Sequence, residues 1–415
     1  MNPWPLVQAD LRRHRAGALA VVLIVALAVA LGVAVSAQER ALRQGSARAA
    51  LKFPLIVGAP GGDTQLVLSA VYLQPAAIGL VPAGVLADLT EARNVRLASP
   101  IGFGDSWQGF PVVGVTPPFV AHLAGGALAE GVAFQRLDEA VVGADVPLAP
   151  GAAFQPAHGT VAVAEAAHPF TYRVVGRLPR QGNPWDRAIV VPIESVWWVH
   201  SLPLGHAVDE ARLYPGGGEE PDWSAVPLGP PWDRDQLTGV PAIVVQPTSP
   251  VAGYQLRQTY RGRDATTAVF PPEVLLQLHH LLGNVRDVVA AISLLTQVLV
   301  IGAILLAVLA SLAQRRRLVA VLRALGASRR YVFATLWLGV ALLLTSGALL
   351  GLALGYLAAF AVSALFAART AIALPVAIAG QELMLVAGIV AIGLVLATIP
   401  AALAYRGSVA EGLRA

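Results

Sequence analysis

The chain contains no cysteine. Disulfide bonds, thiolate metal ligands and cysteine nucleophiles are therefore excluded. It also contains a single lysine, Lys52, in the context Ala-Leu-Lys-Phe-Pro. A P-loop needs the pattern G-x-x-x-x-G-K-[ST], in which backbone N–H groups and the lysine ammonium hold phosphates. Because no such segment exists, the chain is not a P-loop ATPase, and any ATP hydrolysis linked to its function takes place in another chain.

Charged residues are also scarce. Only 13% of the residues are charged and 56% are hydrophobic, and the mean hydropathy is +0.64. A soluble domain carries about 25% charged residues. The composition therefore predicts a membrane protein.

Four apolar runs are long enough to cross a bilayer, and they predict spans at 16–37, 288–313, 331–368 and 383–404. The first run is uncharged over 22 residues. A cleaved signal peptide is the alternative interpretation, but its apolar core is usually about 7–15 residues long, so we favour an anchor. The third run has 38 residues and is expected to project beyond the outer face of the membrane.

The arginines predict the orientation of these spans. The N-terminal segment 1–15, the segment 314–330 and the tail 405–415 together hold 11 arginines and two acids, whereas residues 38–283 hold 16 basic and 21 acidic residues. Since basic residues collect on the cytoplasmic side, we expect both termini inside. The loop 369–382 and the large region after the first span are expected outside.

That large region predicts an α+β periplasmic domain at 52–271, carried on stalk helices at 38–51 and 272–287. Short apolar runs predict strands at Pro54–Val57, Val95–Ala98, Phe110–Val115, Tyr172–Val175, Ala188–Val191 and Ala242–Gln246. Helical patterns interleave at Thr64–Leu73, Pro82–Glu91, Ser195–Ser201 and Val251–Tyr260. The Pro- and Gly-rich stretch 203–239 predicts a mobile surface loop. The predicted fold is thus a membrane protein with four transmembrane α-helices, one before and three after this domain.

The segment from Arg315 to Arg330 holds six arginines and no acid. At 100° per residue, its apolar side chains Leu318, Val321, Leu322 and Leu325 fall on one face. Lipid contact would explain the three arginines at its start. It would not explain the ordered Val-Leu-Arg-Ala-Leu-Gly-Ala core, so we interpret the segment as an amphipathic helix that contacts a cytoplasmic partner.

This segment resembles the coupling segment of FtsX-like, MacB-type permeases of ABC transporters (type VII systems), whose pattern runs roughly R-R-x-E-I-x-V-L-R-A-L-G-A-S-R-R. The order of spans and outer domain is similar along the whole chain, and Leu55–Tyr72 looks like the start of the outer domain in one bacterial branch. Leu318 stands where the family has Glu, so a salt bridge from that position is absent or replaced. The resemblance assigns ATPase coupling to Arg315, Arg316, Arg317, Leu318, Val321, Leu322, Arg323, Ala324, Leu325 and Gly326.

The resemblance implies a homodimer in the bacterial inner membrane, joined to separate ABC ATPase subunits that bind ATP and Mg²⁺. This chain itself would be no enzyme and would bind no cofactor. It would transmit ATP-driven movement to the periplasmic domain and so export or extract a lipoprotein, a peptide or a hydrophobic small molecule. The alternative is an FtsX-like scaffold that activates a periplasmic cell-wall hydrolase without transport. Membrane lipid and a periplasmic or outer-membrane component are further expected partners, and nucleic acid is not.

One further pattern predicts packing within the membrane. Small residues on one helical stripe let backbones approach closely in lipid, and the third span carries five of them at four-residue spacing: Gly347, Gly351, Gly355, Ala359 and Ser363. The stripe does not reveal whether its partner is a span of the same chain or of a second copy.

Other patterns are interpreted as structural, and no catalytic or metal-binding residue is predicted. Gly104-Asp105-Ser106-Trp107 resembles the nucleophile block of GDS-type lipases but lacks a downstream D-x-x-H, so a surface turn is favoured. Glu165 and His168 have the spacing of two metal ligands on one helical face, but the segment around them predicts strand and turn, so a metal pair is not favoured. His279 and His280 are adjacent on a helix and point apart. Trp197 and Trp198 are expected to pack in the outer domain or at its membrane-facing rim.

Overall fold

The computed structural model describes residues 2–74, 78–159, 168–213, 221–281, 326–370 and 373–398, with a few separate residues between 291 and 302. The chain divides into two compact units. The helical unit comprises Met1–Leu42, Leu282–Leu365 and Leu374–Ala415, and the sheet unit comprises Arg43–Leu281 and Phe366–Ala373.

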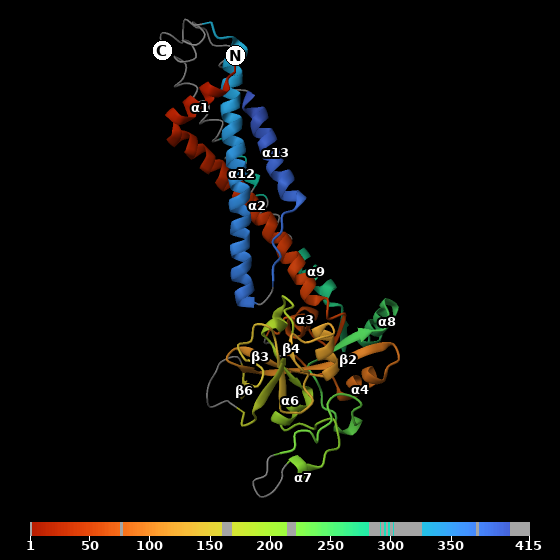
Figure 1. The fold of residues 1–415 in the computed structure, drawn as a ribbon. Helices are drawn as coiled ribbons and strands as arrows, with labels where there is room; N and C mark the ends of the chain where they lie inside the picture. Colours follow the sequence, from red (N-terminus) through yellow and green to blue (C-terminus); the bar gives the residue numbers. More distant parts are fainter. Residues whose placement is uncertain are drawn as a thin grey trace. The chain divides into compact units, whose positions relative to one another are not determined.

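The helical unit contains α1 (Trp4–Arg13), α2 (Arg15–Ala50, as far as Leu42), α12 (Arg329–Thr370) and α13 (Gly380–Leu396). Helices α2 and α12 are long and apolar enough to cross a membrane, and α13 is apolar but shorter. The three helices lie side by side (Figure 1) and share a core of aliphatic side chains: Val25, Val29, Val33, Leu344, Ala348 and Val386.

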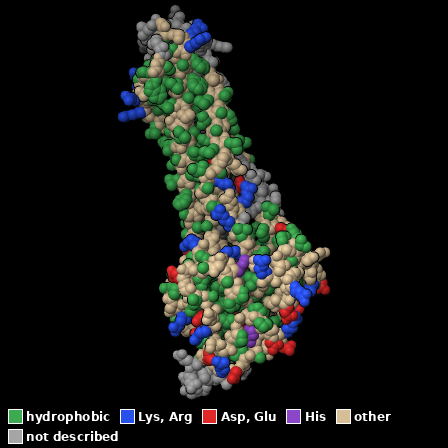
Figure 2. Space-filling view, turned by 45° about the vertical axis from the view of Figure 1, so that its right-hand side comes forward, with side chains coloured by type: hydrophobic (Ala, Val, Ile, Leu, Met, Phe, Trp, Pro, Cys, Tyr) green, Lys and Arg blue, Asp and Glu red, His purple; other side chains and the backbone are tan. Residues whose placement is uncertain are grey.

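Large apolar side chains cover the outside of this unit. Leu27, Leu349 and Phe360 are 66%, 67% and 64% exposed, and Figure 2 shows hydrophobic side chains over most of the visible surface of these helices. A soluble monomer rarely exposes so large an apolar surface. The arrangement, with small residues inside and bulky ones outside, suits helices whose solvent is hydrocarbon.

Helix α2 runs without interruption from Arg15 to Ala50, so the stalk predicted at 38–51 continues the predicted first span as one helix. One boundary differs from the sequence prediction. Helix α13 begins at Gly380, which places Glu382 in its first turn and not in the predicted loop 369–382. Most of the predicted second span, residues 288–313, and the tail 405–415 lie outside the described residues, so the four-span arrangement stays a prediction.

The sheet unit is built on one described sheet in the order β11-β1-β10-β2-β3-β9-β5-β8-β4, with β7 paired to β2 and β6 to β8. Two pairs, β3 with β9 and β5 with β8, are parallel. The strands are β1 (Leu55–Gly58), β2 (Val95–Trp107), β3 (Phe110–Val115), β4 (Glu130–Gly131), β5 (Glu139–Val142), β6 (Ala153–Phe154), β7 (Ala157–His158), β8 (Tyr172–Arg177), β9 (Ile189–Pro192), β10 (Ala242–Pro247) and β11 (Thr267–Val269).

Strand β2 joins the two halves of the sheet. Its first part pairs with β10 as far as Ile101, and its second part pairs with β3 from Gly102 onward. The register shifts between Phe103 and Asp105, where Gly104 adopts a φ of 153°. Such a bulge bends the strand and redirects a side chain, and here the redirected residue is Asp105.

The helices of this unit are α3 (Asp63–Ala70), α4 (Ala83–Glu91), α5 (Pro117–Ala124), α6 (Ile193–Val199), α7 (Glu210–Leu213), α8 (Pro250–Arg261) and α9 (Pro271–Leu281), with short 3-10 turns η2 (Pro184–Arg187) and η4 (Arg234–Gln236). Their ends follow local chemistry. Helix α5 starts with Pro117 and ends at Gly125, whose φ of 68° suits glycine. Helix α8 starts after Ser249, whose Oγ accepts a hydrogen bond from Ala252 N at 3.2 Å.

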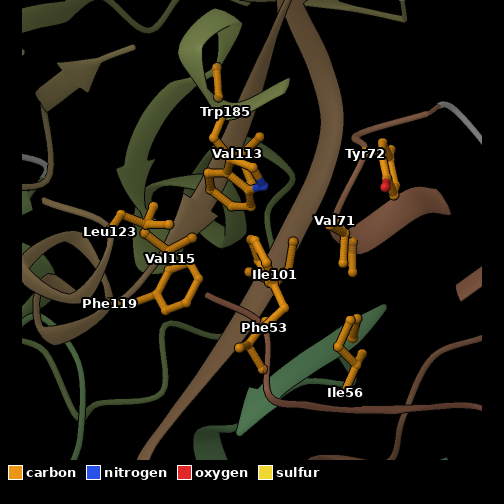
Figure 3. Packing of buried hydrophobic residues seen from close by; sticks show 14 of the residues in the cluster. Phe53, Ile56, Val71, Tyr72, Ile101, Val113, Val115, Phe119, Leu123 and Trp185 are labelled. Atoms are coloured by element: carbon orange, nitrogen blue, oxygen red, sulfur yellow. The ribbon is translucent and has the colours of Figure 1, made fainter. Parts of the chain in front are cut away.

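The central strands are buried on both faces, because alternate residues enter two different cores. Ile56 and Val244 join a cluster centred on Phe53, Phe119 and Trp185, whose rings pack 5.6–6.0 Å apart (Figure 3). Leu55, Val57, Ile243 and Val245 join a second cluster on the opposite face. This double burial explains why these strands are continuous apolar runs in the sequence.

All six predicted strands and all four predicted helices of this unit are present; β3 has the predicted bounds and the others have shifted ends. The prediction missed helices α5 and α7 and the short strands β4, β5, β6, β7 and β11. Most described residues of the stretch 203–239 are exposed or half-buried, as a surface loop requires. Leu204, Trp232 and Leu237 nevertheless anchor it, because they are buried in the second cluster. Trp232 packs 6.2 Å from Trp197, so apolar burial outweighs the high content of Pro and Gly.

Candidate functional site

The small-residue stripe of α12 lies against α2 of the same chain. A Cβ built on Gly347 or Gly355 would come within 2.7 Å of a Cβ of Val25 or Val33, and one built on Gly351 would come within 2.6 Å of the Ala26 carbonyl oxygen. Ala359 is also buried, and Ser363 Oγ donates a hydrogen bond to the Leu374 carbonyl. Because Val25, Val29 and Val33 also recur every four residues, the ridge of one helix fits the groove of the other.

A buried carboxylate ties α13 to the same two helices. Glu382 is 0% exposed and forms an ion pair with Arg40 of α2. Ser36 Oγ donates a hydrogen bond to Glu382 Oε1 at 3.0 Å, and Tyr356 Oη donates one to Oε2 at 3.3 Å. Charged groups within or beside spans are costly unless paired. Sequence reasoning placed Glu382 in the outer loop 369–382 and did not predict this network.

The proposed coupling residues Arg315 to Leu325 lie outside the described residues. Gly326, which the sequence predicts to end that helix, has a φ of 92°, a conformation that glycine adopts easily. Ser328 Oγ accepts a hydrogen bond from Tyr331 N at 3.2 Å next to the start of α12. The segment is therefore joined to α12 by only two residues, Ala327 and Ser328.

The sheet unit contains a cluster of three histidines around one aspartate. Asp105, His158, His168 and His200 each place a potential ligand atom within 4.8 Å of the others. Measured from Asp105 Oδ1, the facing ring nitrogens lie at 3.1 Å (His158 Nδ1), 3.3 Å (His168 Nε2) and 3.6 Å (His200 Nε2). Among the residues that the structure describes, this is the one group with the composition and spacing of a metal site.

Four separate pieces of backbone position this cluster. The bulge in β2 redirects Asp105, and the pairing of β2 with β7 sets His158 directly opposite it. The backbone N–H of His168 donates a hydrogen bond to the Pro156 carbonyl at 2.8 Å, which holds His168 beside β7. His200 is the C-cap of α6. The cluster therefore depends on long-range pairing and on no sequence motif.

The electrostatics of the cluster favour a negative Asp105 beside a cation. Burial alone would raise the pKa of Asp105, but hydrogen bonds and charge from His200 and His168 outweigh it and lower the pKa below its usual value. The interaction with the neighbouring Asp105 carboxylate in turn raises the pKa of His200, against the effect of burial. The positive partner can be a proton on His200 or a metal ion among the rings.

Sequence reasoning did not find this cluster. It treated Asp105 as part of a surface turn and His168 as a possible partner of Glu165, which lies outside the described residues. Asp105 is in fact 8% exposed and lies within a strand. His158 and His200 were not singled out, because neither stands at a recognisable ligand spacing from the others.

A second buried carboxyl, Glu194, lies in α6. Its Oε1 accepts hydrogen bonds from Gly229 N at 2.8 Å and Trp232 Nε1 at 3.0 Å. Its Oε2 has no hydrogen-bond partner in the described part of the chain. Burial raises the pKa of Glu194 to about 7 and lowers the pKa of His206, whose Nε2 is 3.9 Å from Oε1. This carboxyl therefore titrates near neutral pH.

The C-terminal part of the chain matches a described protein family. Residues 290–409 match the family described as FtsX-like permease C-terminal. This range contains the segment 315–330, so the match confirms the resemblance drawn from the sequence. The C-terminal part of the chain is thus similar to the FtsX-like permease family.

The chain is also similar to two solved structures. No curated protein matches the chain. The periplasmic region of MacB from Actinobacillus actinomycetemcomitans is similar with 11% identity and a TM-score of 0.32, covering 54% of this chain and 92% of that one. The extracellular domain of the noncanonic ABC-type transporter YknZ from Gram-positive bacteria is similar with 10% identity and a TM-score of 0.29, covering 52% and 98%. At these TM-scores neither likeness carries an argument about this chain.

Proposed function

We propose that this chain is the membrane subunit of an ABC transporter, which passes ATP-driven movement from a separate ATPase to a periplasmic domain. The observation that carries the proposal is the match of residues 290–409 with FtsX-like permeases, together with the arginine-rich amphipathic segment inside that range. The missing P-loop supports the division of labour, because the energy must then come from a partner subunit.

A continuous route for movement supports this proposal. Two residues join the segment 315–326 to α12, and α12 contacts α2 through backbone-close packing at Gly347, Gly351 and Gly355. Helix α2 then runs unbroken to Ala50, and four residues separate it from the start of β1 at Leu55. A push on the cytoplasmic segment therefore has a covalent or tightly packed path to the first strand of the sheet unit. Tightly packed helices move as rigid pieces, since interiors deform little.

The experiment that tests coupling is capture of the ATPase by the permease from bacterial membranes. Leu322→Asp places a carboxylate on the apolar face of the segment, and Ala320→Asp places it on the opposite face of the same helix. An unpaired carboxylate in an apolar groove costs several kcal/mol, about 2–7 even for a neutral polar group. We expect Leu322→Asp to lose the ATPase and Ala320→Asp to retain it. Equal capture by both variants would show that the segment is a membrane-surface anchor.

The same purification addresses what the machine acts on. We propose export or extraction of an envelope substrate by a homodimer in the inner membrane. A co-purifying lipoprotein or outer-membrane component would support transport. A co-purifying peptidoglycan hydrolase, activated only in the presence of ATP, would instead support the scaffold function.

A further inference from the structure

We propose that the sheet unit binds one divalent transition-metal ion, with Zn²⁺ the best fit, through Asp105, His158, His168 and His200. This inference rests on the sheet unit alone and does not depend on the proposed transport function. Its first support is the convergence of four ligand atoms within 4.8 Å of one another, brought together from four separate pieces of backbone.

The distances match the edges of a zinc tetrahedron. Zinc–nitrogen and zinc–oxygen bonds of about 2.0–2.2 Å place tetrahedral ligand atoms about 3.3–3.6 Å apart. Asp105 Oδ1 lies 3.1, 3.3 and 3.6 Å from the three facing ring nitrogens. An ion at the centre would therefore require only small shifts of the carboxylate. Ring nitrogens that lie as much as 4.8 Å apart would have to approach one another by up to about 1.2–1.5 Å.

The tautomer of His200 is the second support. Its Nδ1 lies 2.7 Å from the Val196 carbonyl oxygen, and because a carbonyl only accepts, Nδ1 must carry the hydrogen. In the neutral ring, Nε2 then points a lone pair at the Asp105 carboxylate, and two acceptors repel each other. A metal ion between them removes the conflict. A ligating histidine commonly donates its other N–H to a backbone carbonyl in this way.

The donor set selects the class of metal. Three imidazoles and one carboxylate suit zinc and its neighbours, whereas Ca²⁺ and Mg²⁺ prefer all-oxygen sites. Four protein ligands fill the tetrahedron and leave no position for a reactive water, which is typical of a structural site. The ion would fasten β2, β7, the chain at His168 and the end of α6 to one another, and so hold this edge of the sheet unit together.

The competing explanation is a cluster held by a proton, with a cationic His200 beside Asp105. The two explanations differ in whether the cluster requires a metal ion, because a cluster held by a proton forms in metal-free buffer. They also differ in His158, whose side chain is 57% exposed. Its removal should matter little to a pair formed by Asp105 and His200, but it would remove one of the four ligands of a metal.

The test measures zinc binding by the full-length chain in detergent, purified without a polyhistidine tag and stripped with a chelator. Competition with a chromogenic chelator and elemental analysis are expected to show about one Zn²⁺ per chain. His158→Gln should weaken zinc affinity by at least about tenfold, since even outer-shell changes cost 10–100-fold. His122→Gln, a histidine of the same unit outside the cluster, should leave affinity unchanged. Because His158 is exposed, its replacement is not expected to disturb folding.

Two further readouts compare the wild type with His158→Gln. Zinc should raise the melting temperature of the stripped wild type but not of His158→Gln. Co²⁺ should give the intense visible absorption of a four-coordinate ion in the wild type and a weaker one in His158→Gln. Absence of zinc binding by the wild type, or equal affinity in wild type and His158→Gln, would overturn the proposal and leave the proton cluster.

Discussion

Gly351 of α12 lies so close to Ala26 of α2 that a Cβ built on the glycine would meet the Ala26 carbonyl oxygen at 2.6 Å. A backbone oxygen cannot turn aside as a flexible side chain can. Only glycine fits at this position without separating the two helices. The contact is thus a point where one methyl group should change the packing of the helical unit.

The first prediction concerns this contact. Alanine is a better helix former than glycine by about 1 kcal/mol, so Gly351→Ala should stabilise α12 if nothing else changed. We expect it instead to lower the melting temperature in detergent, because the helices must move apart and lose contacts worth about 0.6–2 kcal/mol each. Gly388→Ala is the matched control, since nothing lies within 4 Å of a Cβ at Gly388 of α13. If the melting temperature of Gly351→Ala is no lower than that of Gly388→Ala, then α12 and α2 do not approach each other closely at Gly351.

The second prediction concerns the buried ion pair. Arg40→Ala leaves the carboxylate of Glu382 buried without its cation, which typically costs about 3–5 kcal/mol. Replacing both partners, Arg40→Met with Glu382→Met, should recover most of the lost melting temperature, because no uncompensated charge remains. Arg48→Ala, at an exposed position of the same helix, should have little effect. If the double variant does not recover the melting temperature, the hydrogen bonds of Glu382 with Ser36 and Tyr356 are the interactions that stabilise this region.

The third prediction concerns pH. Burial raises the pKa of Glu194 from 4.5 to about 7. Between these two pH values the carboxyl is protonated in the folded state and ionised in the unfolded state. The stabilising contribution is complete below pH 4.5 and is lost as the pH rises through about 7, by on the order of 3 kcal/mol. Glu194→Gln should flatten this dependence, because the amide keeps an acceptor for Gly229 N and Trp232 Nε1 without ionising.

The measurement is denaturant unfolding from pH 4 to 8, followed by tryptophan fluorescence. Six of the eight tryptophans lie in the sheet unit, so the signal reports mainly on that unit. Glu130→Gln, at an exposed position, should keep the wild-type dependence. A wild-type curve without the fall between pH 4.5 and 7 would show that Glu194 is not the buried acid described above.

The fourth prediction is topological. The chain has no cysteine, so single cysteines can be introduced without a background signal. Asp233 and Ser328 are both exposed. Asp233→Cys should react with an impermeant maleimide in cells with an opened outer membrane, whereas Ser328→Cys should react only after the inner membrane is broken. Reaction of Ser328→Cys from outside would reverse the orientation drawn from the arginines.

Local patterns in the sequence determined several features of this protein. Uninterrupted apolar runs set the positions of α2 and α12, because a helix in hydrocarbon needs length and apolar side chains and little else. The four-residue spacing of Gly347, Gly351 and Gly355 predicted a helix face that packs closely against another helix. The absence of a P-loop and the segment 315–330 pointed to a permease that works with another chain.

The tertiary structure alone decided which distant residues meet. The partner of the glycine stripe, the pairing of Arg40 with Glu382 and the gathering of three histidines around Asp105 all join segments far apart in the sequence. Such contacts depend on strand register, on a bulge at Gly104 and on helix packing, none of which has a local signature. Helical and strand periodicity describes how a segment presents its faces, but only the folded chain determines what each face meets.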